Sequence, residues 1–155
     1  MRKHMTEDRP NVTDDRSWLD LEQLATVEVT SEDPSHPVEA ALVSRSGPGW
    51  RASSRGEQTV RLTFDAPQHI RHLRLLFEDA DATRTQEFVI RSLTRGDTAY
   101  RDVVRQQFTF SSGGASRQQE NYDVNLDEVV SLELRIVPNI SGGADVATLK
   151  EWRVG

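Results

Sequence analysis

The side chains with the most evident chemistry are a histidine and several arginines in segments with loop composition. His36 stands between Pro34 and Pro37, in a run of Ser, Asp and Pro that favours turns. An exposed imidazole can orient a ligand hydroxyl, because one ring nitrogen donates a hydrogen bond and the other accepts one. Arg51 and Arg84 lie in or beside other loops, and a guanidinium can hold an anionic group through two parallel hydrogen bonds. The alternative for all three is a solvated side chain on a charged surface.

Neutral amides form a second group of candidates. Gln118 and Asn121 follow a Ser/Gly-rich run over residues 111–116, and Asn139 begins a Gly-rich stretch over residues 139–145. A side-chain amide both donates and accepts hydrogen bonds, as recognition of a sugar hydroxyl requires. Amides are also ordinary turn residues. We predict that these two loops border a ligand.

No catalytic motif stands out in the sequence. The chain has no cysteine, which excludes a cysteine nucleophile, a disulfide and a thiolate metal site. Nucleophile elbows, phosphate-binding Gly loops and metalloprotease helices are missing as well. On a strand, the odd spacing of His69 and His72 places them on opposite faces, which makes them poor co-ligands for a metal. The sequence therefore predicts a protein that is not an enzyme.

The charge balance narrows the range of partners. The chain has 155 residues and a net charge of -6, which disfavours broad binding to phosphate backbones. No run approaches the roughly 18 apolar residues of a membrane-spanning helix, and the first residues lack the apolar core of a signal peptide. We therefore expect a chain with no membrane span that is soluble, cytoplasmic by default, and not a general nucleic-acid binder.

Short segments of alternating polar and apolar residues must position the candidate side chains. The mean hydropathy of -0.62 suits strands that bury one face and leave the other wet. About eight strands are predicted from this alternation and the turn signals between its segments, over residues 25–31, 59–64, 70–77, 87–93, 100–110, 122–126, 130–136 and 147–154. The expected fold class is all-β, a two-sheet antiparallel jelly-roll sandwich.

The chain is long enough for one domain with its own core and short for two. Residues 1–17 are polar with mixed charges, which predicts a flexible tail, and the folded domain is expected over residues 18–155. Residues 18–24 are compatible with one or two helical turns or with an irregular strap. Residues 38–43 suggest a short helical turn.

The order and spacing of six short motifs resemble those of discoidin domains. The motifs are Val27–Asp33, Pro37–Leu42, Gly49–Ala52, Gln58–Leu62, Leu132–Pro138 and Leu149–Gly155. Over about residues 25–155, the chain is similar to galactose-binding-like jelly rolls, also called coagulation-factor type C (F5/8 type C) domains.

This resemblance implies recognition by loops at one end of a rigid sandwich. Members bind glycans, lipid head groups, peptides or broken DNA, so the fold does not choose among these ligands. The candidate loops carried over by position are residues 32–37, 46–57, 78–85, 111–121 and 139–145. The resemblance also implies that Trp50 packs into the sandwich end instead of offering its ring to a sugar or base. Trp152, in the last strand, is interpreted as core.

Many glycan-binding members hold a structural calcium ion through an Asp-Gly pair, backbone carbonyls and a glutamate of the last strand. Glu151 stands at the position of that glutamate. The Asp-Gly pair is missing, because Leu42 is followed by Val43-Ser44-Arg45. Calcium prefers roughly six to eight oxygen ligands, charged ones included. We therefore predict no cofactor and keep calcium, held through Glu151, as the alternative.

The predicted function is a non-catalytic binding module whose end loops recognise a carbohydrate. The candidate ligand-binding residues are His36, Arg51, Arg84, Gln118, Asn121 and Asn139. One alternative is an intracellular protein-interaction or DNA-repair-like adaptor, favoured by the missing Asp-Gly pair and the missing export signal. The other is a homo-oligomeric structural subunit whose exposed sheet face packs against a second copy.

Overall fold

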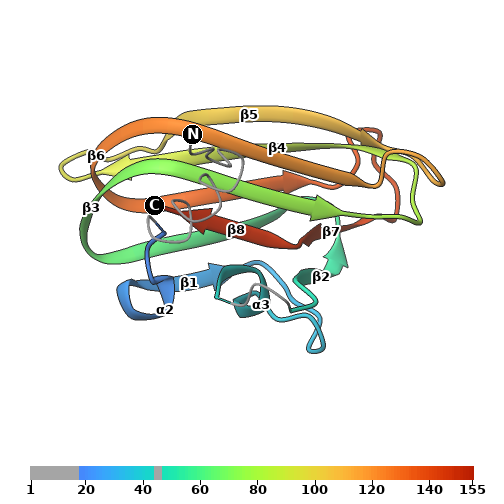
Figure 1. The fold of residues 1–155 in the computed structure, drawn as a ribbon, viewed down its shortest axis with the longest axis horizontal. Coiled ribbons are helices and arrows are strands. Elements are labelled where there is room, and N and C mark those ends of the chain that lie inside the picture. Colours follow the sequence, from blue (N-terminus) through green and yellow to red (C-terminus); the bar gives the residue numbers. More distant parts are fainter. Residues whose placement is uncertain (1–17, 44–46) are drawn as a thin grey trace, which may run out of the picture.

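Two layers of antiparallel β-strands face each other in the computed structural model, which describes residues 18–43 and 47–155 (Figure 1). In chain order, the elements are α2 (Leu21–Leu24), β1 (Ala25–Val29), α3 (Glu39–Leu42), β2 (Trp50–Arg55), β3 (Gln58–Glu78), β4 (Arg84–Thr94), β5 (Arg101–Phe110), β6 (Arg117–Val137), β7 (Val146–Leu149) and β8 (Glu151–Val154). The predicted all-β jelly-roll sandwich is confirmed.

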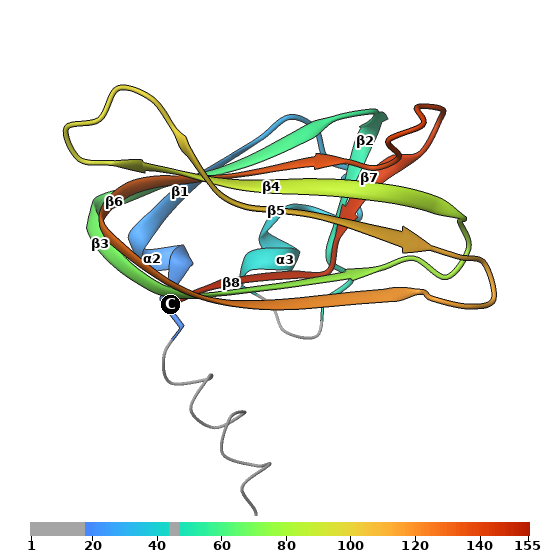
Figure 2. The same cartoon turned by 90° about the horizontal axis from the view of Figure 1, so that it is seen from above.

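Strands β3 and β6 run through both layers. The first layer has the strand order β1-β3-β6-β4-β5 and uses the beginning of β3 and the end of β6. The second layer uses their other halves, with β8 paired to β3 from Leu73 to Leu76. The two long strands curve together at one end of the sandwich (Figure 2). The pairing register shifts repeatedly between Thr63 and His72, and such irregularities bend a strand.

The sequence-based prediction split β3 and β6 in two, and this was wrong. Asp65-Ala66-Pro67 was expected to end a strand, yet β3 continues through it. Pro67 is tolerated because the ladder between β3 and β6 is already interrupted between Thr63 and Gln68, where no backbone donor is required.

Conversely, the predicted strand over residues 147–154 is two strands. They separate at Lys150, since β7 pairs with β2 and β8 with β3.

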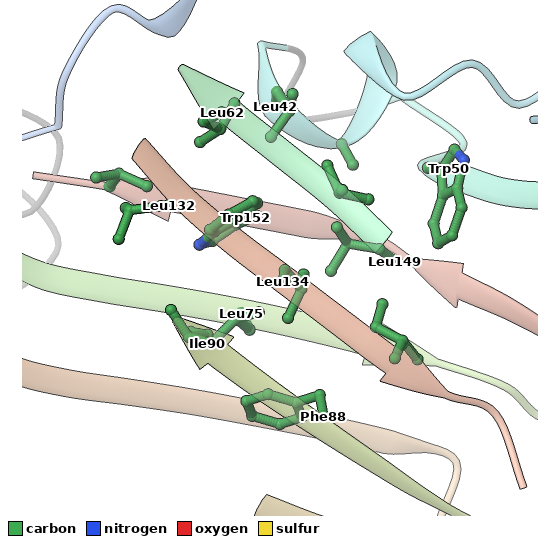
Figure 3. Packing of buried hydrophobic residues seen from close by; sticks show 14 of the residues in the cluster. Leu42, Trp50, Leu62, Leu75, Phe88, Ile90, Leu132, Leu134, Leu149 and Trp152 are labelled. Atoms are coloured by element: carbon green, nitrogen blue, oxygen red, sulfur yellow. The ribbon is translucent and has the colours of Figure 1, made fainter. Parts of the chain in front are cut away.

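The hydrophobic core lies between the two layers. Its buried residues alternate with exposed ones along the strands, as the sequence pattern predicts. Strand β3 buries Val60, Leu62 and Phe64 on one face, and its neighbour β6 buries Leu132 and Leu134 on the same face of the sheet, in register with Leu62 and Val60. Figure 3 shows these leucines around the ring of Trp152.

Both tryptophans interpreted as structural are buried, with Trp50 1% and Trp152 0% exposed. The indole Nε1 of Trp50 donates a hydrogen bond to the carbonyl of Ser31 at 3.0 Å. Gly49, just before Trp50, has φ of 77°, and an added Cβ would lie 2.7 Å from the carbonyl oxygen of Leu149. This close approach requires glycine.

Of the two alternatives for residues 18–24, the structure has a short helix, α2, which lies beside β1 (Figure 1). The predicted turn over residues 38–43 is α3, which lies against β8 and β2. The predicted tail over residues 1–17 falls outside the described residues. Among the residues that are described, no helix has the length and apolar character needed to cross a membrane.

Candidate functional site

Loops from distant parts of the chain meet at the end of the sandwich where β2 and β7 lie (Figure 2). The amide of Asp33 donates to the carbonyl of Arg51 at 2.8 Å, and that of Asp79 to the carbonyl of Ser116 at 2.8 Å. The amide of Ile140 donates to the carbonyl of Thr85 at 2.8 Å. The loops that the resemblance implied therefore share one end, although the loop after β5 covers residues 111–116 because β6 begins at Arg117.

Two adjoining hollows at this end, of about 200 and 430 Å³, form what we call the end groove. Both are bordered by Arg51, Glu78 and Thr148. The other residues along the end groove are His36, Pro48, Trp50, Asp79, Ala80, Asp81, Ala82, Ala144, Asp145, Val146, Leu149 and Lys150. Its lining is mostly polar and is supplied by four separate chain segments.

His36 and Arg51 are the two predicted site residues that lie in the end groove. The backbone holds them together, since the amide of Arg51 donates to the carbonyl of His36 at 3.2 Å. The Nδ1 atom of His36 lies 3.1 Å from Oγ of Ser35, and no hydrogen bond to its Nε2 is found among the described residues. Hydrogen bonds from the backbone and hydroxyl of Ser35 lower the pKa of Asp33. This carboxylate therefore stays charged beside the imidazole.

Arg84 is buried, in contrast to the exposed arginine expected from the sequence. Its side chain is 1% exposed and its Nε lies 2.9 Å from Oδ2 of Asp79. Its Nη1 donates to the carbonyl of Pro138 at 2.7 Å, and its guanidinium carbon lies 4.7 Å from the ring centroid of Phe110. Arg84 therefore lies in the interior behind the end groove, where it contacts the groove residue Asp79.

The remaining amide candidates bond to other protein groups. Gln118 is buried and accepts a hydrogen bond from Gln86 at 2.9 Å. Asn121 lies on β6, outside the loops, and accepts from Nε of Arg74 at 2.9 Å. Asn139 donates to Oδ2 of Asp145 at 3.1 Å within its own loop. None of the three is among the residues that border the end groove, and their role in binding stays a prediction.

The side chains around Glu151 give little support for a calcium ion. Glu151 lies on β8 with its Oε2 3.4 Å from Nε of Arg153, so its charge already has a partner. In the two described stretches of the chain, no group of three or more His, Asp or Glu side chains could hold a metal ion. A calcium ion held through Glu151 is not supported by this geometry.

Sequence reasoning missed Glu78, Asp81 and Thr148. The carboxylates were not distinguishable from common surface acids, although they fall in a loop that the resemblance marked. Thr148 gave no signal, because it belongs to an alternating strand pattern. Its Oγ1 is buried without a hydrogen-bond partner among the described residues, beside the end groove. A buried hydroxyl without a partner suits an ordered water molecule.

The comparisons with known proteins identify the fold. No protein-family model matches the sequence, and no curated protein matches it. The F5/8 type C domain of a Bacteroides fragilis protein superposes with a TM-score of 0.59 at 14% identity, covering 89% of this chain and 94% of that one. This chain has a discoidin-like fold.

Solved structures of carbohydrate-binding modules share this discoidin-like fold. The family 32 module of NanJ from Clostridium perfringens, in complex with galactose, has a TM-score of 0.59 and 14% identity, covering 84% of this chain and 92% of that module. The family 32 module of AlyQ, in complex with 4,5-unsaturated mannuronic acid, has a TM-score of 0.60 and 17% identity, covering 86% and 95%.

Proposed function

We propose that this protein is a non-catalytic carbohydrate-binding module that holds its ligand in the end groove. The observation that carries the proposal is the gathering of His36, Arg51, Glu78 and Thr148 around one polar groove at the loop end. The sugar-bound modules of the same fold support it. The alternative adaptor for broken DNA is less well supported, because Glu78, Asp79, Asp81 and Asp145 would repel phosphates there.

The end groove offers complementary groups for sugar hydroxyls. The guanidinium of Arg51 donates and the carboxylate of Glu78 accepts, whereas the Oγ1 atom of Thr148 is itself buried. Trp50 borders the groove, but its 1% exposure leaves no ring face for stacking. Recognition in this groove therefore depends on hydrogen bonds more than on aromatic contact. Each such bond has a modest net value, so we expect affinities weaker than those of modules with an exposed platform.

A glycan array tests the proposal directly. Labelled protein is applied to neutral and acidic glycans, once with calcium and once with a chelator, and each positive glycan is then titrated by calorimetry. We expect binding that does not change with the chelator, because the carboxylate of Glu151 is already paired with Arg153. No signal above background under either condition would overturn the proposed function.

Matched arginine variants locate the ligand. Arg51→Ala removes an exposed donor that borders the end groove, whereas Arg105→Ala removes an arginine on β5 that is paired with Glu87 and Asp102. Binding should fall in the first variant and persist in the second. Equal losses in both would move the ligand away from the end groove.

A further inference from the structure

The buried Arg84 connects the bases of three loops at this end of the sandwich. It stands at the start of β4, just after the loop that carries Asp79, and its Nε holds that carboxylate at 2.9 Å. Its Nη1 reaches the carbonyl of Pro138, where the loop over residues 139–145 begins. Its guanidinium covers the ring of Phe110, the last residue before the loop over residues 111–116. No other residue in the described part of the chain makes all three contacts.

Asp79 links the buried Arg84 to the turn that forms one wall of the end groove. Its Oδ1 accepts hydrogen bonds from the amides of Asp81 and Ala82, at 3.1 and 3.2 Å, which fixes the turn from residue 79 to residue 82. Its other oxygen, Oδ2, is the atom that Arg84 holds. The residues of this turn border the larger hollow, opposite Ala144 and Asp145 from the other loop.

We propose that Arg84, acting through Asp79 and the carbonyl of Pro138, is the positioning residue of the end groove. It builds the groove before a ligand arrives, so that little ordering is left for the binding step. This inference rests on the proposed carbohydrate-binding function, and it assigns Arg84 a role without any contact to the ligand.

The energetics of Arg84 suit positioning better than general stabilisation. Its Nη2 is buried and has no hydrogen-bond partner among the described residues, which is unfavourable for a charged group. An apolar side chain of similar length would fill this space without that cost, as buried ion pairs often contribute little to stability. What an apolar residue cannot do is hold the Asp79 turn and the Pro138 carbonyl at the same time.

Amide hydrogen exchange of the ligand-free protein tests the inference. The variants are Arg84→Gln, Arg84→Lys and Asp79→Asn, with Arg105→Gln on the outer face as the matched control. In Arg84→Gln, the amides of Asp81, Ala82 and Ile140 should exchange about tenfold faster or more, while those of Leu132 and Leu134 in the sheet keep their rates. Arg84→Lys should restore part of the protection at Asp81 and Ala82, since an ammonium can still pair with Asp79.

The exchange pattern separates positioning from a merely structural role. Faster exchange throughout the sheet would show that Arg84 stabilises the whole fold, and unchanged exchange at Asp81 and Ala82 would show that it does not order the turn. Either result overturns the inference. Asp79→Asn keeps the side-chain volume and must loosen the same turn, so it decides the matter if Arg84→Gln fails to fold.

Binding to immobilised galactose-terminated and N-acetylgalactosamine-terminated glycans gives the second readout. We expect the affinity of Arg84→Gln to fall about tenfold and that of Arg105→Gln to stay unchanged. If the unaltered protein binds neither these glycans nor any glycan of the array, the proposed function fails, and the exchange data alone decide whether Arg84 builds the groove. If the protein binds glycans and Arg84→Gln binds equally well, the inference fails and the proposed function stands.

Discussion

The end groove and the outer face of the first layer carry the same kinds of charged residues, arranged in opposite ways. On the outer face, register brings one acidic or basic side chain from each strand into a single row. In strand order, the row is Glu28, Arg61, Glu133, Arg91 and Asp102. Its signs alternate, so each charge has its partners beside it. In the end groove, Glu78 lies 3.9 Å from Arg117, but Arg51 belongs to no ion pair found among the described residues.

The charged side chains of the outer face are paired with one another, whereas the end groove contains an arginine with no ion-pair partner among the described residues. The outer face also has a hollow, of about 310 Å³, over Val89. Two arginines that border this hollow are already in ion pairs, since Arg105 lies 2.7 Å from Glu87 and Arg135 lies 2.9 Å from Glu57. A ligand there would have to displace those partners. Hollows of similar size therefore differ in what they offer, and the end groove is the better candidate site.

The largest effect is expected from Glu133→Ala, at the centre of the row. The Glu133 side chain is 7% exposed and lies between Arg61 at 2.8 Å and Arg91 at 3.5 Å. Removing it leaves two guanidinium groups facing each other, and the partial exposure of both arginines moderates the cost. We expect the free energy of unfolding to fall by about 2 kcal/mol in urea denaturation. Glycan binding should persist. A loss of binding in a folded variant would contradict the division between the two regions.

Arg51→Ala should show the opposite combination of effects, with lower glycan affinity and nearly unchanged stability. It removes an exposed donor from the end groove, so we expect the affinity for a bound glycan to fall about tenfold, or about 1.4 kcal/mol. The free energy of unfolding should change by less than about 0.5 kcal/mol, as for most surface substitutions. Calorimetric titration and urea denaturation of the same preparation measure both. Unchanged affinity with lowered stability would place Arg51 with the structural charges.

The sheet architecture could be predicted from sequence because it depends on local alternation. The face of Val60, Leu62 and Phe64 is visible in the sequence, and it is the face that is buried. The continuity of β3 across Pro67 was not visible, because a proline reads as a strand end unless the irregular pairing around it is known. The break at Lys150 was hidden for the same reason, since it depends on which strands β7 and β8 join.

The candidate site was predictable only as a set of loops. The resemblance marked loops that meet at one end of the sandwich, and the structure brings His36 and Arg51 into one groove there. Arginine burial could not be predicted, because it depends on contacts between residues far apart in sequence. Arg84 and Pro138 are 54 residues apart, yet they share a hydrogen bond. Arg51 and Arg84 have the same chemistry, and only the fold makes one exposed and the other buried.

A smaller effect is expected from Tyr100→Phe, which tests how the row on the outer face is covered. Ser131 donates its hydroxyl proton to the carbonyl of Leu62 at 2.8 Å, so the hydroxyl of Tyr100 must donate to Ser131, 2.8 Å away. Phenylalanine keeps the ring, which lies 5.8 Å from the guanidinium carbons of both Arg61 and Arg91. We expect a loss of about 1 kcal/mol in the free energy of unfolding and no change in glycan binding. No loss of stability would mean that ring contacts alone hold this loop.

The smallest expected effect is a loss of stability at low pH, when the carboxylate of Asp79 beside the end groove becomes protonated. Burial raises the pKa of this carboxyl, but the hydrogen bonds from Arg84 and the Asp81 amide outweigh it and hold the pKa below its ordinary value of 3.8. A pKa that is lower in the folded protein means that the charged form stabilises the fold. That contribution is present at neutral pH, and it is lost as the pH falls below 3.8 and through the folded value.

Comparison with Asp79→Asn isolates this contribution from the other titrating groups nearby, which include Glu78 and Asp81 on the same loop and Asp145 on the facing loop. The difference in unfolding free energy between the two proteins should be largest near neutral pH and should shrink as the pH falls below 3.8. Urea denaturation at a series of pH values measures it. A difference that stays constant across this range would show that the charge of Asp79 does not stabilise the turn, and that the amide hydrogen bonds to its Oδ1 suffice to hold the groove wall.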